Sequence, residues 1–168
     1  MNRKIIPILI SEVDRARLAA YIDGEGHINV CAKGMRSKIK ARRTPSMLLR
    51  IDICNTDIRL MEWCKRVTGV GNICLDRRTA DHRRGGTRRL LYRWAVCDRQ
   101  AERIITECLP FFVIKREQAD TALAFRRTFY GSGGWKENVT PEKLALRFHL
   151  KNELHRLKHI EQPNGLAN

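Results

Sequence analysis

Hydrophobic and polar positions along the chain follow two periods, and their order predicts a repeated helix–strand–strand unit. In some stretches apolar residues recur every three to four positions, as in a helix with one buried face, and in others at every second position, as in a half-buried strand. Ser11 is a residue type that caps helix N-termini, and Gly24 and Gly26 follow the first helical run. The predicted helices span about 12–23, 56–68, 99–109, 115–129 and 140–159, and the predicted strands about 28–33, 46–55, 72–78 and 88–97.

This order of elements predicts one α+β domain over residues 1–168. Its core is expected over about 12–129, and a C-terminal helix is expected over about 140–160. The strands should form a four-stranded, mostly antiparallel sheet with helices on one face and basic residues on the other. Arg50 and Asp52 are expected on the outer face of that sheet. The side chains expected on its buried face are Leu49, Ile51, Ile53 and Trp94.

Positive charge is abundant and concentrated in two segments. The 168 residues hold 33 Lys and Arg against 18 Asp and Glu, a net charge of +15. Residues 33–50 and 76–93 supply most of this excess, and both segments lie in predicted hairpins. The charge favours a polyanionic partner, with nucleic acid first and an anionic membrane second, over an ordinary metabolic role. Because the basic residues do not follow one helix face, a membrane partner is not expected.

The cysteines and the apolar runs indicate a protein that stays inside the cell. None of the six cysteines stands in a C-x-x-C pair, so free thiols are expected, most of them small buried apolar side chains. No run approaches the ~18 apolar residues of a membrane-spanning helix, and the short apolar run near the start does not fit a signal peptide. The expected compartment is the cytoplasm or an organelle.

The end of the first predicted helix carries an unusual pair of acids. Asp23 and Glu25 stand between glycines where the helix dipole disfavours negative charge, and each has an ordinary reading as a turn former or a surface acid. The whole run, LAAYIDGEG over residues 18–26, closely resembles the signature of the LAGLIDADG homing endonucleases, in particular the small single-motif members. Residues 70–73 and 109–118 also resemble that family, whose fold is an αββαββα core with a DNA-binding sheet.

The resemblance implies a site-specific DNA endonuclease that hydrolyses phosphodiester bonds with Mg²⁺ or another divalent cation such as Mn²⁺. Glu25 takes the place of the metal-binding acid, which is more often Asp in the family, and Gly24 is assigned to the same metal site. Asn55 stands where Gln is usual, near the active-site water. Arg59 and Lys115 match the basic residues that support the scissile phosphate. The expected catalytic residues are therefore Glu25, Asn55, Arg59 and Lys115.

A single motif further implies a homodimer bound to double-stranded DNA at a long pseudo-palindromic site. One motif supplies one acid, whereas cutting both strands needs two active sites related by a twofold axis. The expected dimer interface is formed by Leu18, Ala19, Ala20, Ile22 and Asp23. A two-stranded ribbon fits the major groove, and the side chains expected to face base edges are Asn29, Lys33, Ser46, Arg50, Asp52, Asp76, Arg78 and Arg93. Those expected at phosphates are Lys38, Lys40, Arg42, Arg43, Arg83 and Arg84.

Two other functions remain open at this stage. A protein of the same fold that has lost cleavage could act as an intron maturase or a DNA-binding regulator, and the unusual Glu25 and Asn55 keep that alternative open. An unrelated RNA-binding or ribosome-associated protein would account for the basic charge. It would not account for the acidic, glycine-flanked end of the first helix.

Overall fold

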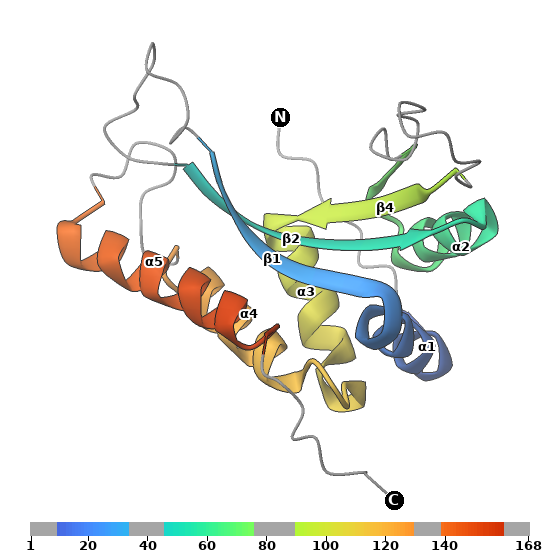
Figure 1. The fold of residues 1–168 in the computed structure, drawn as a ribbon. Helices are drawn as coiled ribbons and strands as arrows, with labels where there is room; N and C mark the ends of the chain where they lie inside the picture. Colours follow the sequence, from blue (N-terminus) through green and yellow to red (C-terminus); the bar gives the residue numbers. More distant parts are fainter. Residues whose placement is uncertain (1–9, 34–45, 76–89, 130–138, 160–168) are drawn as a thin grey trace, which may run out of the picture.

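A computed structural model of the chain describes residues 10–33, 46–75, 90–129 and 139–159 (Figure 1). The long helices and strands follow one another in the order that the sequence predicts. A short 3₁₀ helix, Leu109–Phe111, follows the third long helix. In chain order the other elements are α1 (Glu12–Glu25), β1 (Gly26–Lys33), β2 (Ser46–Asn55), α2 (Ile58–Thr68), β3 (Asn72–Leu75), β4 (Tyr92–Cys97), α3 (Asp98–Cys108), α4 (Arg116–Arg127) and α5 (Pro141–Arg156).

The strands form one sheet in the order β1-β2-β4-β3, and every neighbouring pair is antiparallel. β2 lies beside both β1 and β4, with Ile51 opposite Ile28 on one side and Val96 on the other. Figure 1 shows the helices gathered on one side of this sheet, which leaves the other side for the outward side chains. The predicted α+β class and the antiparallel four-stranded sheet are confirmed.

The buried face of the sheet also matches the predicted alternation. Leu49, Ile51, Ile53 and Trp94 are all fully buried. The indole Nε1 of Trp94 donates a hydrogen bond to the Val70 carbonyl oxygen at 3.0 Å. The buried side of the last strand is therefore the Trp94 side, as predicted, and a hydrogen bond satisfies the one polar atom of this large side chain.

The first helix ends later than its glycines predict. α1 continues through Gly24 to Glu25, and Gly26 caps it with its backbone N–H on the Ile22 carbonyl oxygen. A Cβ atom at Gly26 would lie 2.7 Å from the Ile22 Cα, so the chain passes too close to the helix there for any side chain. A helix tolerates an interior glycine at about 1 kcal/mol when tertiary contacts hold it, and for this reason Gly24 does not end α1.

The second helix begins later than predicted. It starts at Ile58 instead of near Thr56, because Asp57 is the N-cap and its side chain accepts a hydrogen bond from the Arg59 amide at 2.9 Å. The strands predicted over 72–78 and 88–97 are strands over Asn72–Leu75 and Tyr92–Cys97, and residues 76–89 lie outside the described part.

The predicted dimer interface on α1 needs correction. Leu18, Ala19 and Ile22 are fully buried within the single chain, and Asp23 is 8% exposed. These four side chains face the core of their own chain and offer no surface to a second copy. Only Ala20 of the predicted set is exposed. The run of small residues indicates a close helix contact, but which side of the helix faces outward follows from its packing on the sheet.

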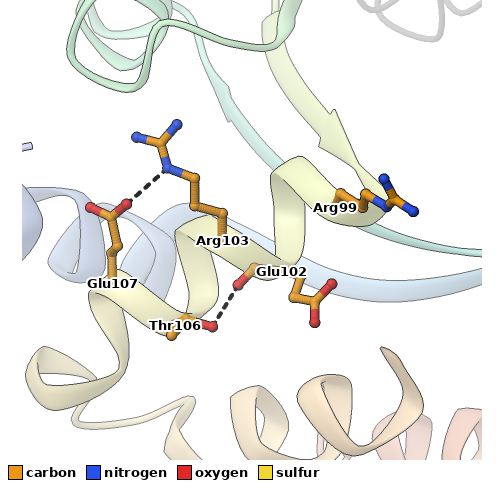
Figure 2. A pocket seen from close by; sticks show the side chains of 5 residues that line it. All are labelled: Arg99, Glu102, Arg103, Thr106 and Glu107. Atoms are coloured by element: carbon orange, nitrogen blue, oxygen red, sulfur yellow. Dashed lines mark hydrogen bonds and ion pairs between the residues drawn. The ribbon is translucent and has the colours of Figure 1, made fainter. Parts of the chain in front are cut away.

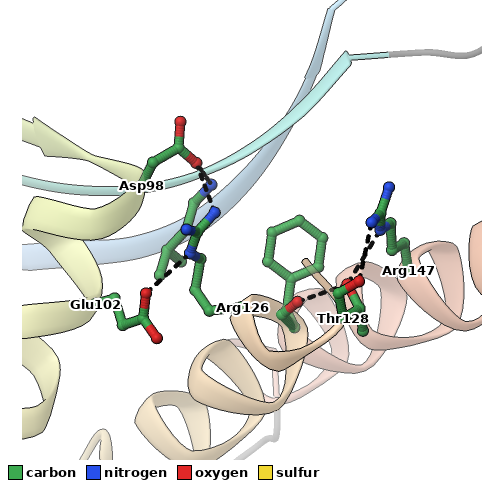
Figure 3. A network of polar contacts seen from close by, with 7 residues as sticks. Asp98, Glu102, Arg126, Thr128 and Arg147 are labelled. Carbon is green, nitrogen blue, oxygen red and sulfur yellow. Dashed lines mark hydrogen bonds and ion pairs between the residues drawn. The ribbon is translucent and has the colours of Figure 1, made fainter. Parts of the chain in front are cut away.

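Buried arginines join α3, α4 and α5 (Figure 3). Arg126, 6% exposed, donates to Asp98 at 3.3 Å and to Glu102 at 3.2 Å. Arg147, 5% exposed, donates to both the hydroxyl and the carbonyl oxygen of Thr128, each at 3.0 Å. Because hydrogen-bonded charges of this kind fix helix positions, α4 has a defined place beneath the sheet.

The six cysteines are free thiols, but most of them are not in the core. Cys64 and Cys108 are buried, and burial raises the pKa of both thiols to about 12, so neither is reactive at neutral pH. The strand alternation places the others on the outer face of the sheet. These half-buried or exposed residues, Cys31, Cys54, Cys74 and Cys97, correct the expectation of mainly buried cysteines.

Candidate active site and nucleic-acid interface

Glu25 and Asn55, both predicted as catalytic, are in direct contact. Glu25 is the last residue of α1 and Asn55 the last of β2, and the amide Nδ2 of Asn55 donates to Oε2 of Glu25 at 2.6 Å. The other end of the Asn55 amide, Oδ1, accepts a hydrogen bond from the Asp57 backbone N–H at 2.8 Å. This second contact orients the amide, so that its amino group faces the exposed Glu25 carboxylate.

Arg59 is paired with an acid that the sequence did not single out. Its Nη2 lies 2.5 Å from Oδ2 of Asp57, and its Nε donates to the same carboxylate at 3.0 Å. The hydrogen bonds from Arg59 lower the pKa of Asp57 to about 2 and raise the pKa of Arg59. Since both groups are exposed, the pair is weak and Arg59 can leave it. An Asp just before an apolar helical run is an N-cap signal that could have located Asp57.

The Asp23 carboxylate joins the end of α1 to the segment before α4. Its Oδ2 accepts from the Val113 and Ile114 amides at 2.8 and 3.3 Å, and its Oδ1 accepts from the Lys115 amide at 2.9 Å. An acid is disfavoured at the C-terminal end of α1, but the same carboxylate lies at the N-terminal end of α4, where the helix dipole favours it. These contacts explain why Asp23 is buried within its own chain, where the sequence predicts a turn former, a surface acid or a dimer contact.

Lys115 is held at the same end of α1 as Glu25. The Lys115 ammonium donates to the backbone carbonyl oxygen of Asp23, two residues before Glu25. Burial lowers the pKa of Lys115, and the nearby Asp23 charge opposes that shift. The structure thus brings the carboxylate of Glu25, the amide of Asn55 and the ammonium of Lys115 to one end of the first helix.

The oxygen atoms at this helix end fit a hard divalent cation that shares its ligands with a substrate. Within the described ranges, no three His, Cys, Asp or Glu side chains are grouped to hold an ion by themselves. Mg²⁺ commonly takes one or two carboxylates and completes its shell with water and phosphate oxygens. The exposed Glu25 carboxylate provides such a ligand, and nothing would lie within 4 Å of a Cβ at Gly24, so the helix end is open to substrate.

On the outer face of the sheet, arginines surround a buried acid. Asp52, 9% exposed, lies 3.5 Å from Arg50 and 3.8 Å from Arg93. The sequence predicts that Asp52 faces outward and contacts a base edge. It does lie on the outer face, but it is buried between two arginines. Among the described side chains, Nε of Arg50 and Oδ1 of Asp52 are buried without a hydrogen-bond partner.

Other predicted DNA contacts lie partly outside the described chain. Ser46 is half-buried, and it stands opposite Lys33 in the pairing at the end of β1 and the start of β2. Asn29, further along β1, accepts a hydrogen bond from Lys158, a residue beyond α5 that carried no signal in the sequence. The predicted contacts that fall outside the described residues are Lys38, Lys40, Arg42, Arg43, Asp76, Arg78, Arg83 and Arg84.

A hollow on α3 has different chemistry (Figure 2). Arginines and glutamates line it in balance, and Arg103 donates to Glu107 at 2.9 Å. It lies on the helical side of the sheet, because α3 packs against β2 and β4. A balanced surface of this kind does not attract a polyanion. No helix of the described residues is long and apolar enough to cross a membrane.

Comparison with known proteins identifies the fold. No protein-family model matches the chain, and no curated protein sequence matches it significantly. Among solved structures, the homing endonuclease I-CvuI in complex with its target superposes with a TM-score of 0.66 at 15% identity, covering 89% of this chain and 85% of I-CvuI. The archaeal intron-encoded homing endonuclease I-Vdi141I, complexed with DNA, gives 0.66 at 15% identity, covering 89% and 87%.

Two further homing endonucleases show the same fold. I-TnaI gives a TM-score of 0.60 at 16% identity, covering 86% of this chain and 92% of its own. The meganuclease I-SmaMI, bound to DNA, gives 0.61 at 21% identity, covering 83% of this chain but 44% of its own. The chain therefore has the homing endonuclease fold, as the resemblance of residues 18–26 predicts.

Asp23→Asn should loosen the segment that carries Lys115. Asparagine has one acceptor oxygen and no charge, so it cannot serve the amides on both sides. The free energy of unfolding should fall by about 1.5–3 kcal/mol, the range for hydrogen bonds to a charged group. Hydrogen exchange should become faster at the Val113 and Lys115 amides.

Asp120→Asn is the matched control, because Asp120 is exposed on α4 and lies 3.4 Å from Arg116. It should change stability by less than about 1 kcal/mol and leave exchange at residues 113–115 unaltered. Unchanged exchange there in Asp23→Asn would contradict the anchoring role of Asp23.

Proposed function

We propose that this chain is a site-specific DNA endonuclease that hydrolyses phosphodiester bonds with a divalent metal ion. The observation that carries the proposal is the exposed Glu25 carboxylate, oriented by Asn55 at the helix end where Lys115 is also held. The basic outer face of the sheet supports a DNA partner. The solved I-CvuI and I-Vdi141I structures, which share this fold, are complexes with DNA.

Glu25 is the residue that would hold the metal. Its carboxylate stays exposed, and the Asn55 amide contacts one of its two oxygens, Oε2. Bound Mg²⁺ or Mn²⁺ would supply an activated water and neutralise charge on the phosphate. Asn55 orients the carboxylate, and the Asp57 amide in turn orients Asn55. The family that residues 18–26 resemble more often has aspartate at the place of Glu25, and glutamate reaches further. It more often has glutamine at the place of Asn55, and asparagine is shorter.

Lys115 and Arg59 would stabilise the negative charge that builds up on the phosphate in the transition state. Lys115 is already in position, because its amide and its ammonium are both bonded to Asp23. Arg59 is exposed and paired with Asp57, so a phosphate would compete with that carboxylate for the guanidinium. A bidentate phosphate contact is a strong competitor for an exposed pair.

The outer face of the sheet would lie in the major groove, which admits a two-stranded ribbon. Arg50 and Arg93 lie on that face, 3.5 and 3.8 Å from Asp52, and Nε of Arg93 also donates to Sγ of Cys54 at 3.4 Å. Arginine donates in a planar fork that matches guanine, whereas the buried Asp52 acts through its neighbours. We therefore propose Arg50 and Arg93 as base-reading residues and Asp52 as their positioning residue.

The active protein would be a homodimer joined through the exposed side of α1. Ala20 and Gly24 lie on that side, four residues apart, which permits close approach of a second helix. Val113 and Ile114, 86% and 67% exposed, lie beside the same helix end, since their amides bond to Asp23. Such exposed apolar side chains fit a partner surface.

Glu25→Gln should separate DNA cleavage from DNA binding. The amide keeps the size of the side chain but removes the charge that holds the cation. Cleavage in Mg²⁺ should fall by about 10²–10³-fold or more. Affinity for DNA, measured in Ca²⁺, should hold or rise because a negative charge near phosphate is lost. Glu62→Gln, at an exposed position of α2, is the matched control and should cut at the wild-type rate.

Full cleavage by Glu25→Gln would overturn the assignment of Glu25. A wild-type protein that binds a selected site but cuts it in neither Mg²⁺ nor Mn²⁺ would favour the DNA-binding regulator instead.

Ala20→Glu should prevent dimer formation. A twofold axis would bring the two introduced carboxylates together in a contact that excludes water, where like charges repel strongly. Sedimentation should give a dimer for the wild type and a monomer for the variant. Ala145→Glu places the same charge on the exposed face of α5 and should leave the dimer intact. A wild-type monomer that cuts both strands in one encounter would refute the dimer.

A further inference from the structure

Lys158 reaches the outer face of the sheet from the far end of the chain. It follows α5, which is anchored in the core by Leu154, 1% exposed. The Lys158 ammonium donates a hydrogen bond to Oδ1 of Asn29 on the edge strand β1. Burial lowers the pKa of Lys158, and the nearby charge of Asp52 opposes that shift. A half-buried lysine whose ammonium bonds to one amide of another element has a defined position, unlike a solvated surface charge.

The chemistry of lysine settles which way the Asn29 amide points. An ammonium group has donors and no acceptor, so the atom of Asn29 that faces it must be the oxygen. The amino group Nδ2 of Asn29 is then the part of the amide left for a ligand. Together, Asn29 and Lys158 offer mainly hydrogen-bond donors to the outer face, because the Asn29 oxygen is directed towards the ammonium.

The surroundings add donors to the same region. Arg50 stands opposite Asn29 in the strand register, and Arg93 lies on the next strand, β4. Among the described residues, the acid near Lys158 is Asp52, which is already paired with both arginines. A ligand that meets Asn29 here therefore meets several donors.

A protein surface that offers mainly hydrogen-bond donors distinguishes guanine from adenine in the major groove. Asparagine reads adenine by accepting from N6 and donating to N7, and this needs its oxygen to face the base. Lys158 instead holds the Asn29 oxygen towards its own ammonium. Guanine instead offers two acceptors, N7 and O6, in the major groove. We propose that Lys158 sets the base preference of Asn29, so that the pair selects guanine and rejects adenine. The inference rests on the proposed function, because it places duplex DNA on the outer face of the sheet.

The test is a selection of bound sites from randomised duplex DNA, with the full chain in Ca²⁺. The wild type should prefer guanine over adenine about tenfold at one position of each half-site, within the range for a specific base contact. Asn29→Ala should remove the preference at that position alone, which locates it. Lys158→Met keeps the apolar stem but frees the Asn29 oxygen, and should shift the same position towards adenine by a similar factor.

Two further variants separate this role from charge and folding. Lys158→Arg keeps a donor against Asn29 and should retain the guanine preference. Lys151→Met removes a lysine two turns earlier on α5 and should leave every position unchanged. Thermal unfolding of each variant identifies any loss of fold.

Failure of this inference and failure of the proposed function give different results. A guanine preference that survives in folded Lys158→Met, including one accompanied by uniformly weaker binding, would overturn the inference and leave the proposed function intact. A wild-type protein that selects no site at all would contradict the proposed function and the inference with it.

Discussion

The Asp23 carboxylate is the interaction on which the candidate site depends. This negative charge lies at the C-terminal end of α1, where the helix dipole disfavours it. The carboxylate accepts hydrogen bonds from backbone amides just before α4. One contact thereby joins two elements about 90 residues apart in sequence and places Lys115 beside the turn that carries Glu25. Without it, the carboxylate and the ammonium of the proposed catalytic pair would have no fixed relation.

The first helix has three roles, divided among its faces. Its inner side, with Leu18 and Ile22, is buried in the core, and this leaves only Ala20 and its exposed neighbours for a partner. Its C-terminal end carries the candidate chemistry. Gly26 lets the chain turn from that end directly into β1, since a side chain there would strike the helix backbone. The candidate active site and the sheet that would read DNA are therefore joined with no linker between them.

The sequence predicts the parts of this protein that follow from local periodicity. Alternation in β2 and around Trp94 gives the buried face correctly. The run over residues 18–26 singles out Glu25, whose role stays a prediction. Asp23 could not be assigned in the same way, because its partners lie far along the chain and depend on how α4 packs. The same holds for Lys158, whose contact with Asn29 arises only once α5 lies against the sheet. Local patterns define elements, whereas contacts between elements determine what each polar residue does.

We propose that this fold, with one oriented glutamate per chain, cuts DNA at a defined site. The most direct measurement is a selection of cleaved molecules from a randomised duplex pool in Mg²⁺, followed by mapping of both cut positions. We expect one long, approximately twofold-symmetric site cut on both strands, with the two cuts related by the same symmetry. Recovery of sites that are bound but never cut, or of cuts without any preferred sequence, would contradict the claim.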